Sequence, residues 1–209
     1  MRTLWAFLMI AGHVFAPWRR GWRVRWGARR DEPDQSLAGE RLIGNASWEF
    51  THAVSIAAPR EDVWPWIAQL GQGRGGCSFE LLENLVGCRI TNADAILPEH
   101  QTLAVGDEIR LHRNATPLRV AVIDPGRSLV LRGTPTDDPP PGTDSLWTFH
   151  LLADGPGTCR LVERGKSIHG NTLTDRLFFS PLLVEPIGFV MSREMLLGIK
   201  ARAENATTP

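Results

Sequence analysis

The side chains best placed to do chemistry in this sequence form two pairs, Arg74 with Glu83 and Arg164 with His150. Each pair joins a cation that could polarise a substrate to a group that could act as a general base. In an apolar cavity, a cyclase or dehydratase needs little more than such a pair. The alternative for both arginines is an ion pair at the surface or at a pocket rim, where most charge pairs lie. The sequence alone therefore assigns no catalytic residue.

Several other kinds of chemistry lack their sequence signatures. The chain has no tyrosine, no HExxH or GxSxG motif and no cysteines spaced as CxxC. We therefore expect no metal, no cofactor and no disulfide framework, and we interpret the cysteines as free, mostly buried thiols: Cys77, Cys88 and Cys159. His52 falls on the apolar face of a predicted strand, where a lone histidine is more often a hydrogen-bonded core residue than a catalyst.

The charge of the chain is balanced overall but unevenly distributed. The first thirty residues contain seven arginines and no acidic residue, which leaves 16 basic and 23 acidic residues in the remainder. An acidic domain repels phosphates, so we expect no nucleic-acid partner. With 43% hydrophobic and 22% charged residues among 209, the chain is predicted to form one globular unit.

An uncharged apolar run of 16 residues, Thr3 to Trp18, precedes six of these arginines. A membrane span needs about 20 apolar residues, and a cleavable signal peptide carries its charge before the run, so neither pattern matches well. Three interpretations remain: a short anchor with its arginines on the cytoplasmic side, a segment lying in the lipid interface, or a helix packed on the domain. We expect membrane contact through residues 3–30 beside a cytoplasmic domain, and a cytoplasmic protein otherwise.

The segment VWPWIAQLGQGRGG, Val63 to Gly76, combines a helical apolar face with a cluster of glycines. A phosphate-binding glycine loop leads from a strand into a helix, but here Gly71 and Gly73 follow the helix. They are therefore predicted to end it in the left-handed conformation. A second short helix is predicted at 77–87.

The rest of the chain alternates predicted strands with turn sequences. Short turns such as DPG and DGPG imply hairpins and hence an antiparallel sheet. The fold class is predicted as α+β, with a curved sheet of about six to seven strands wrapped on a long C-terminal helix at roughly 185–204, and a gap between them as a typical ligand site. Apolar patterning predicts strands at 46–59, 105–112, 118–124, 128–133, 145–152 and 158–168.

Several motifs together resemble the helix-grip fold of the START-like superfamily, also called SRPBCC, and within it the polyketide cyclase/dehydratase-like group. They include IAAPREDVWPWIAQLGQGRGG, ILPEHQTLAVGDEIRL, LWTFHL, RLVERGKS and FVMSREMLLGIKARAE, and the resemblance covers roughly residues 40–204. We accordingly divide the chain into an N-terminal segment (1–30), a lead-in (31–45), the helix-grip domain (46–204) and a disordered tail (205–209).

The resemblance implies a cavity for hydrophobic small molecules but no particular reaction, because the superfamily includes lipid carriers, hormone receptors, aromatase/cyclases and oxygenase subunits. The first hypothesis is therefore non-catalytic binding of a lipid or other apolar small molecule. The second is a cyclase, aromatase or dehydratase acting on a polyketide-like substrate, and the third is an interaction module for an unknown protein partner.

For the first hypothesis, candidate pocket residues can be chosen by their chemistry. Gln69, Arg74 or Arg164 would hold the polar end of the ligand, with Glu83 beside Arg74. Ordinary core packing is the alternative for each apolar candidate. Large aromatic area and flexible methionines suit a loosely specified ligand, and the pocket would be lined by Trp66, Phe79, Trp147, Phe149, Met191 and Met195.

Overall fold

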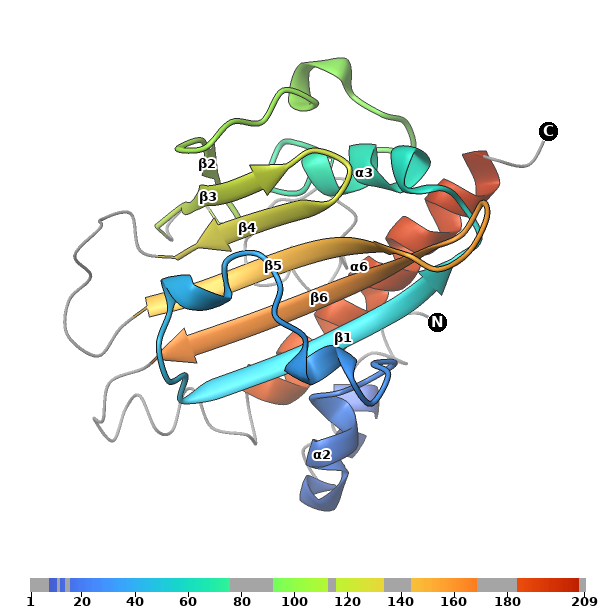
Figure 1. The fold of residues 1–209 in the computed structure, drawn as a ribbon. Helices are drawn as coiled ribbons and strands as arrows, with labels where there is room; N and C mark the ends of the chain where they lie inside the picture. The colour runs from blue at the N-terminus through green and yellow to red at the C-terminus, as the bar shows by residue number, and fades with distance from the viewer. Residues whose placement is uncertain are drawn as a thin grey trace.

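The computed structural model describes residues 8–10, 12–13, 16–75, 92–112, 116–133, 144–168 and 184–206. Its centre is a six-stranded antiparallel sheet in the order β1-β6-β5-β4-β3-β2 (Figure 1). The long helix α6 (Val184–Ala206) is the last described element, and α3 (Arg60–Ala68) follows the first strand. The predicted α+β class, sheet and terminal helix are confirmed. The strands are β1 (Trp48–Ile56), β2 (Glu108–Ile109), β3 (Leu118–Asp124), β4 (Ser128–Arg132), β5 (Asp144–Ala153) and β6 (Cys159–Ile168).

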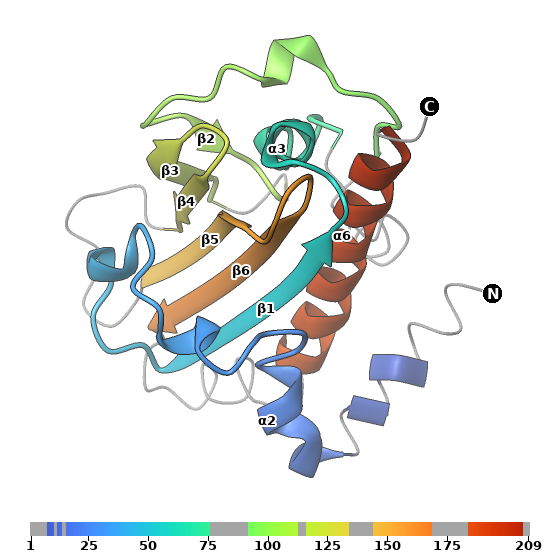
Figure 2. The same cartoon turned by 45° about the vertical axis from the view of Figure 1, so that its right-hand side comes forward.

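The sheet curves around α6, which lies along its concave face (Figure 2). Apolar side chains from both layers form the main core, among them Phe149 and Leu161 from the sheet and Leu196 and Ile199 from α6. Each such fully buried side chain stabilises the fold by roughly 1.5–3 kcal/mol relative to exposure. Helix α3 packs at one end of this layer, against α6 and β5.

A pair of glycines follows the end of α3. Pro65 lies inside the helix, where it removes one backbone hydrogen bond. Beyond the last turn, Gly71 and Gly73 have φ angles of 123° and 73°, a region that favours glycine. The glycines follow α3 with positive φ, as predicted, but the helix itself ends at Ala68 with Gln69 as its C-cap, so the glycines turn the chain after the helix rather than cap it. The second predicted helix, at 77–87, lies outside the described residues.

Strand β2 is much shorter than the predicted strand at 105–112. It pairs with β3 only through Glu108 and Ile109. Ile109 is fully buried, whereas Val105 is exposed, so the segment offers the core a single anchor rather than an alternating face. An edge strand with one anchor needs no longer pairing.

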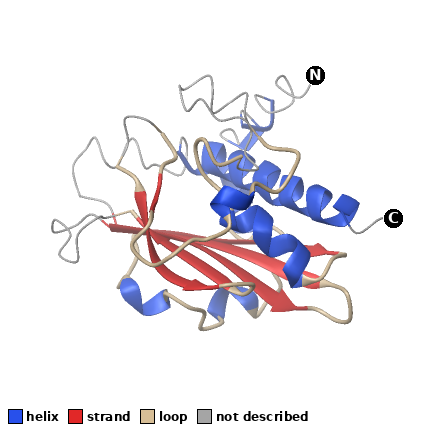
Figure 3. Ribbon diagram, turned by 90° about the horizontal axis from the view of Figure 1, so that it is seen from above, coloured by secondary structure: helices blue, strands red, loops and turns tan. Residues whose placement is uncertain are grey.

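The lead-in crosses the opposite, convex face of the sheet, as the view from above shows (Figure 3). It contains two short 3₁₀ turns, η2 (Glu32–Asp34) and η3 (Glu40–Leu42). Arginines of β6 hold it in place: Arg160 donates to Glu32 at 2.6 Å and Arg164 donates to Glu40 at 2.6 Å. Burial is the largest single influence on the pKa of Glu32 and would raise it, but the hydrogen bonds from Arg160 and from the backbone N–H of Arg29, together with the charges of both arginines, lower it overall.

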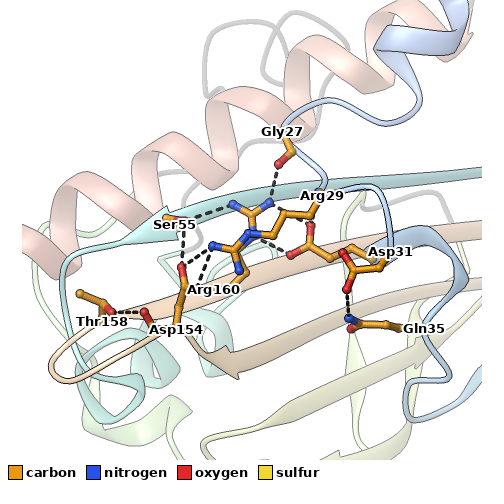
Figure 4. Close-up of polar contacts among 9 residues, drawn as sticks. Gly27, Arg29, Asp31, Gln35, Ser55, Asp154, Thr158 and Arg160 are labelled. Carbon is orange, nitrogen blue, oxygen red and sulfur yellow. Dashed lines mark hydrogen bonds and ion pairs between the residues drawn. The ribbon is translucent and has the colours of Figure 1, made fainter.

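The end of the N-terminal segment, just before the lead-in, is tied to the β5–β6 turn (Figure 4). Arg29 donates to Asp154 at 2.8 Å, and Arg160 also donates to Ser55 of β1 at 3.2 Å and to the carbonyl of Gly27. Segments far apart in the sequence are therefore joined across one face by charge-assisted hydrogen bonds.

The N-terminal segment protects the free edge of β1. It includes η1 (Pro17–Arg19) and the single-turn helix α2 (Arg20–Arg23). The backbone N–H groups of Thr51 and Ala53 donate to the carbonyls of Val24 and Trp26, at 2.8 and 3.1 Å. Covering an edge strand in this way blocks pairing with other chains. Within the described residues, no helix is long and apolar enough to cross a membrane.

Candidate functional site

A cavity of about 360 Å³ lies between the sheet and α6. Its walls are mainly apolar, with Phe50 and Trp147 from the sheet facing Phe189, Met191 and Met195 from α6. A volume of this size falls in the range of small-molecule sites. The gap predicted between the sheet and the terminal helix is therefore present.

The strand register shows how the sheet forms the floor of the cavity. Directly paired residues of adjacent strands share a face, so Phe50, Gly165 and Trp147 form one row across β1, β6 and β5. Gly165 has no side chain, and a Cβ placed there would collide with the Phe50 ring. The glycine therefore lets the two aromatic rings flank an open floor.

The neighbouring row carries the polar wall of the cavity. It places His52 of β1 directly beside Glu163 of β6, and Ser192 of α6 closes the group from above. The imidazole Nδ1 of His52 lies 2.6 Å from Ser192 Oγ and 3.6 Å from Glu163 Oε2, and the Ser192 hydroxyl also contacts Glu163. Trp147 Nε1–H donates to Glu163 Oε1 at 2.6 Å. We call His52, Ser192 and Glu163 the polar cluster.

The polar cluster is well shielded from water. Its side chains are at most 7% exposed. Among them, His52 also uses Nε2 to donate to the carbonyl of Arg23 at 3.0 Å, which connects the cluster to the N-terminal segment. In such surroundings hydrogen bonds and charges act strongly, because solvent does not screen them.

A second polar group lies at the N-terminal end of α6. Glu185 accepts hydrogen bonds from Arg20 at 2.9 Å, from Arg23 Nε at 3.0 Å and from the indole of Trp48 at 3.1 Å. A carboxylate in the first turn also interacts favourably with the helix dipole. This group joins the N-terminal segment, β1 and α6 at one end of the cavity.

The structure brings together only part of the set of pocket residues predicted from the sequence. Trp147, Met191 and Met195 line the cavity. Phe79 and Glu83 lie outside the described residues. The remaining candidates are described but do not line the cavity: Trp66, Gln69, Arg74, Phe149 and Arg164.

These remaining side chains have identifiable structural partners. Gln69 accepts a hydrogen bond from the amide of Leu97 at 3.0 Å and so holds the segment around η4 (Pro98–His100). Arg74 donates to the carbonyls of Ala68 and His100, at 3.1 and 3.2 Å. Burial lowers the pKa of Arg74. In this position Arg74 fastens a loop rather than facing the cavity.

Trp66 and Phe149 are buried in the main core. Arg164 and His150 belong to the convex face, because they alternate with the cavity-facing residues of β6 and β5. There Arg164 pairs with Glu40, and the pKa of His150 is lowered to about 4 by burial and by the nearby Arg164. The predicted pair of Arg164 with His150 therefore lies on the opposite side of the sheet from the cavity.

Sequence reasoning missed Glu163, Ser192, Arg23 and Glu185 as site residues. The sequence did contain a signal that Glu163 could be a site residue. Glu163 lies two positions after Leu161 on β6 and therefore on the same, core-facing side of the strand, where a carboxylate needs partners. His52 was placed correctly on the apolar face. It is a hydrogen-bonded core residue, and it also lines the cavity.

The element order, the curved sheet and the long terminal helix on its concave face define a helix-grip fold, which is the fold that the sequence resemblance implies. No family model and no curated protein matches the chain. Similar solved structures include a norcoclaurine synthase point mutant from Thalictrum flavum in complex with a transition-state analogue (12% identity, 79% of this chain, 99% of that chain, TM-score 0.47).

Two further similar structures are a protein from Thermobifida fusca and the di-domain ARO/CYC BexL from the BE-7585A biosynthetic pathway. The first is 18% identical over 76% of this chain and 95% of that chain, with a TM-score of 0.47. The second is 14% identical over 78% of this chain and 48% of that chain, with a TM-score of 0.40. At these scores the fold assignment rests on the chain's own elements, and the similar structures indicate no ligand or reaction.

Proposed function

We propose that the protein binds a hydrophobic small molecule or lipid in the cavity between the sheet and α6. The observation that supports this most directly is the cavity of about 360 Å³ lined by Phe50, Trp147, Phe189, Met191 and Met195. An apolar void in a folded protein forfeits packing contacts, and an apolar ligand restores them. Flexible methionines on the α6 wall suit ligands of varied shape.

The proposal is tested by native mass spectrometry of the purified full chain, followed by solvent extraction. A co-purifying apolar compound, released on unfolding, is the expected result. The variant Met191→Trp, which fills the cavity from the α6 side, should abolish co-purification. Val105→Ala, at an exposed position away from the cavity, serves as the control. A wild-type protein that neither retains nor takes up any apolar compound would contradict the proposal.

A second candidate function is a cyclase, aromatase or dehydratase that uses the same cavity. One observation favours it: a carboxylate and an imidazole, Glu163 and His52, lie together on the cavity wall, where general acid–base catalysis would need them. Loss of turnover of a polyketide-like substrate in Glu163→Gln, with binding retained, would establish it. A wild-type protein that binds such a substrate without converting it would instead favour the first proposed function, binding without catalysis.

We also propose that the N-terminal segment contacts an anionic membrane surface. Part of it packs on the domain, since Met9 and Ile10 contact the apolar cluster of Phe189 and Val190. Trp18 is nevertheless 79% exposed, and Leu8 and Trp22 are also largely exposed. Exposed arginines surround them at positions 19, 20, 25 and 30. Aromatic side chains beside arginines are typical of segments that bind the lipid interface.

Membrane contact is tested by co-sedimentation with lipid vesicles. The full chain should bind phosphatidylcholine vesicles weakly and vesicles that also contain phosphatidylserine more strongly. Trp18→Ser should reduce this binding several-fold, because it removes the most exposed aromatic ring of the segment without touching the core. Val105→Ala should leave it unchanged. Equal sedimentation with and without phosphatidylserine would contradict an attraction to anionic lipid. No sedimentation with either kind of vesicle would contradict membrane contact altogether.

A further inference from the structure

The hydrogen bonds of the polar cluster require one proton more than its usual protonation states supply. Two of these hydrogen bonds meet at Ser192 Oγ, one shared with His52 Nδ1 and one with Glu163 Oε2. A serine hydroxyl has a single hydrogen, so the other bond needs a hydrogen from His52 or from Glu163. The second ring nitrogen of His52 already needs its own hydrogen to donate to the carbonyl of Arg23.

Two arrangements satisfy this count. In one, His52 is an imidazolium, it donates to Ser192, and Ser192 donates to the Glu163 carboxylate. In the other, Glu163 is a carboxylic acid, it donates to Ser192, and Ser192 donates to a neutral His52. In both arrangements one extra proton is held by either His52 or Glu163, and Ser192 connects the two side chains.

The same count of hydrogen-bond donors and acceptors determines which hydrogen bonds the polar cluster can form with a ligand. Every hydrogen of the group is already donated, including that of the Trp147 indole, which Glu163 Oε1 accepts. Acceptor capacity remains in both arrangements. A carboxylate can accept about four hydrogen bonds and the described residues supply two, whereas the acid form of Glu163 accepts only the one from Trp147. A ligand that bonds here must therefore bring the hydrogen.

The charged groups beside the cluster narrow the ligand class further. Arg23 shares the Glu185 carboxylate with Arg20, and Lys166, which also lines the cavity, shares the Glu40 carboxylate with Arg164. A ligand carboxylate or ionised phosphate brings no hydrogen to the polar cluster, and a ligand ammonium would be buried beside a cluster whose extra proton already balances one negative charge, at a large cost in free energy. We propose that the polar cluster is the binding site for an uncharged hydroxyl group at one end of an apolar ligand, an alcohol or a phenol. This inference rests on the proposed function, since it names the polar end of the ligand that the cavity takes.

Two matched probes test the inference, a naphthol and its methyl ether, titrated into the full chain by calorimetry. The ring systems are the same, but only the naphthol can donate a hydrogen bond. The naphthol should bind about tenfold more tightly, the effect of a hydrogen bond to an ionised or strongly polar acceptor. Equal affinities within about twofold would overturn the inference while leaving cavity binding intact. Binding of neither probe would overturn the proposed function as well.

Glu163→Gln is the informative variant, because its amide satisfies the same network without the extra proton. The amide would donate to Ser192, Ser192 would donate to neutral His52, and the amide oxygen would still accept from Trp147. If Glu163 is ionised in the wild type, the preference for the naphthol should fall to about threefold or less, since hydrogen bonds to a neutral acceptor are roughly half as strong. If Glu163 is protonated in the wild type, the preference should stay the same. Affinity for the ether should not change. Ser128→Ala, which removes a hydroxyl away from the cavity, where it contacts His150, should keep the full preference.

The position of the extra proton can be measured directly by NMR. Nitrogen and carbon NMR of the wild type at neutral pH should show either both ring nitrogens of His52 protonated or the Glu163 carboxyl protonated. In Glu163→Gln, His52 should be neutral. A wild type with neutral His52 and ionised Glu163 would overturn the shared-proton assignment, whatever the ligand results.

Discussion

Arg23 in the N-terminal segment and Glu185 in the first turn of α6 form an ion pair in which neither side chain is more than 3% exposed. Removing Arg23 leaves the buried Glu185 carboxylate with only the partly exposed Arg20 and the indole of Trp48 as partners. Arg23→Ala should therefore lower the free energy of unfolding by about 3 kcal/mol, the lower end of the range for a broken buried pair, measured by urea denaturation. Arg20 contacts the same carboxylate but is 47% exposed, so Arg20→Ala should cost at most about 1 kcal/mol. Similar losses for the two variants would show that burial does not determine the strength of this contact.

Gly165 should be needed for the open floor of the cavity. In Gly165→Ala the new methyl group collides with the Phe50 ring, so the ring should turn into the cavity and reduce its volume. Uptake of an apolar probe should fall about tenfold or more. Gly188→Ala is the matched control on the opposite wall, because a Cβ there meets nothing within 4 Å. A crystal structure of Gly165→Ala with Phe50 unmoved would contradict this account.

Acid should destabilise the protein through His150. Burial, followed by the positive charge of Arg164, lowers the pKa of His150 from 6.5 to about 4. The unfolded chain therefore takes up this proton first, and stability present above pH 6.5 is lost as the pH falls toward 4. The loss should reach roughly 3 kcal/mol. His13, whose pKa burial also lowers, acts in the same direction.

His150→Gln isolates this contribution. Urea denaturation between pH 7.5 and 5 should give a flatter stability profile for the variant than for the wild type, because the glutamine cannot take up the proton. Identical profiles would place the acid sensitivity of this pH range elsewhere, for example at His13, because the pKa values of Glu32 and Glu40 lie below 4.5 and outside the range measured.

Cys159 should be almost inert in the folded protein. It is fully buried, and burial raises the pKa of its thiol from 9.0 to about 11. Because only the thiolate reacts, alkylation by iodoacetamide should be roughly 100-fold slower than for an ordinary thiol from ionisation alone. Peptide mass spectrometry before and after denaturation measures the difference. Rapid native labelling would show that this part of the core opens locally.

Much of the fold could be predicted because its patterns are local. Strands β3, β5 and β6 alternate over seven to ten residues, and their predicted bounds agree with the structure to within one residue. The start of α3 and the glycine turn that follows it depend on side-chain and backbone preferences of adjacent residues. The extent of β2 could not be predicted, because it depends on what β3 pairs with rather than on residues 105–112 themselves.

The site was predicted less completely than the fold. Trp147, Met191 and Met195 line the cavity, but Arg164 faces the lead-in and Arg74 fastens a loop. An arginine on a strand alternates between two faces, and the sequence does not show that the lead-in returns to cover the convex one. The pairing of Arg164 with Glu40 spans 124 residues of chain.

The amino-acid sequence by itself determined the α+β class, the antiparallel strands and the long terminal helix, because apolar periodicity and turn residues act over a few positions. Only the tertiary structure decided which polar groups meet. His52, Glu163 and Ser192 come from β1, β6 and α6, and strand register and helix rotation bring them into contact. Hydrogen bonds form over about 3 Å, so residues far apart in the chain become a site only when packing has placed them.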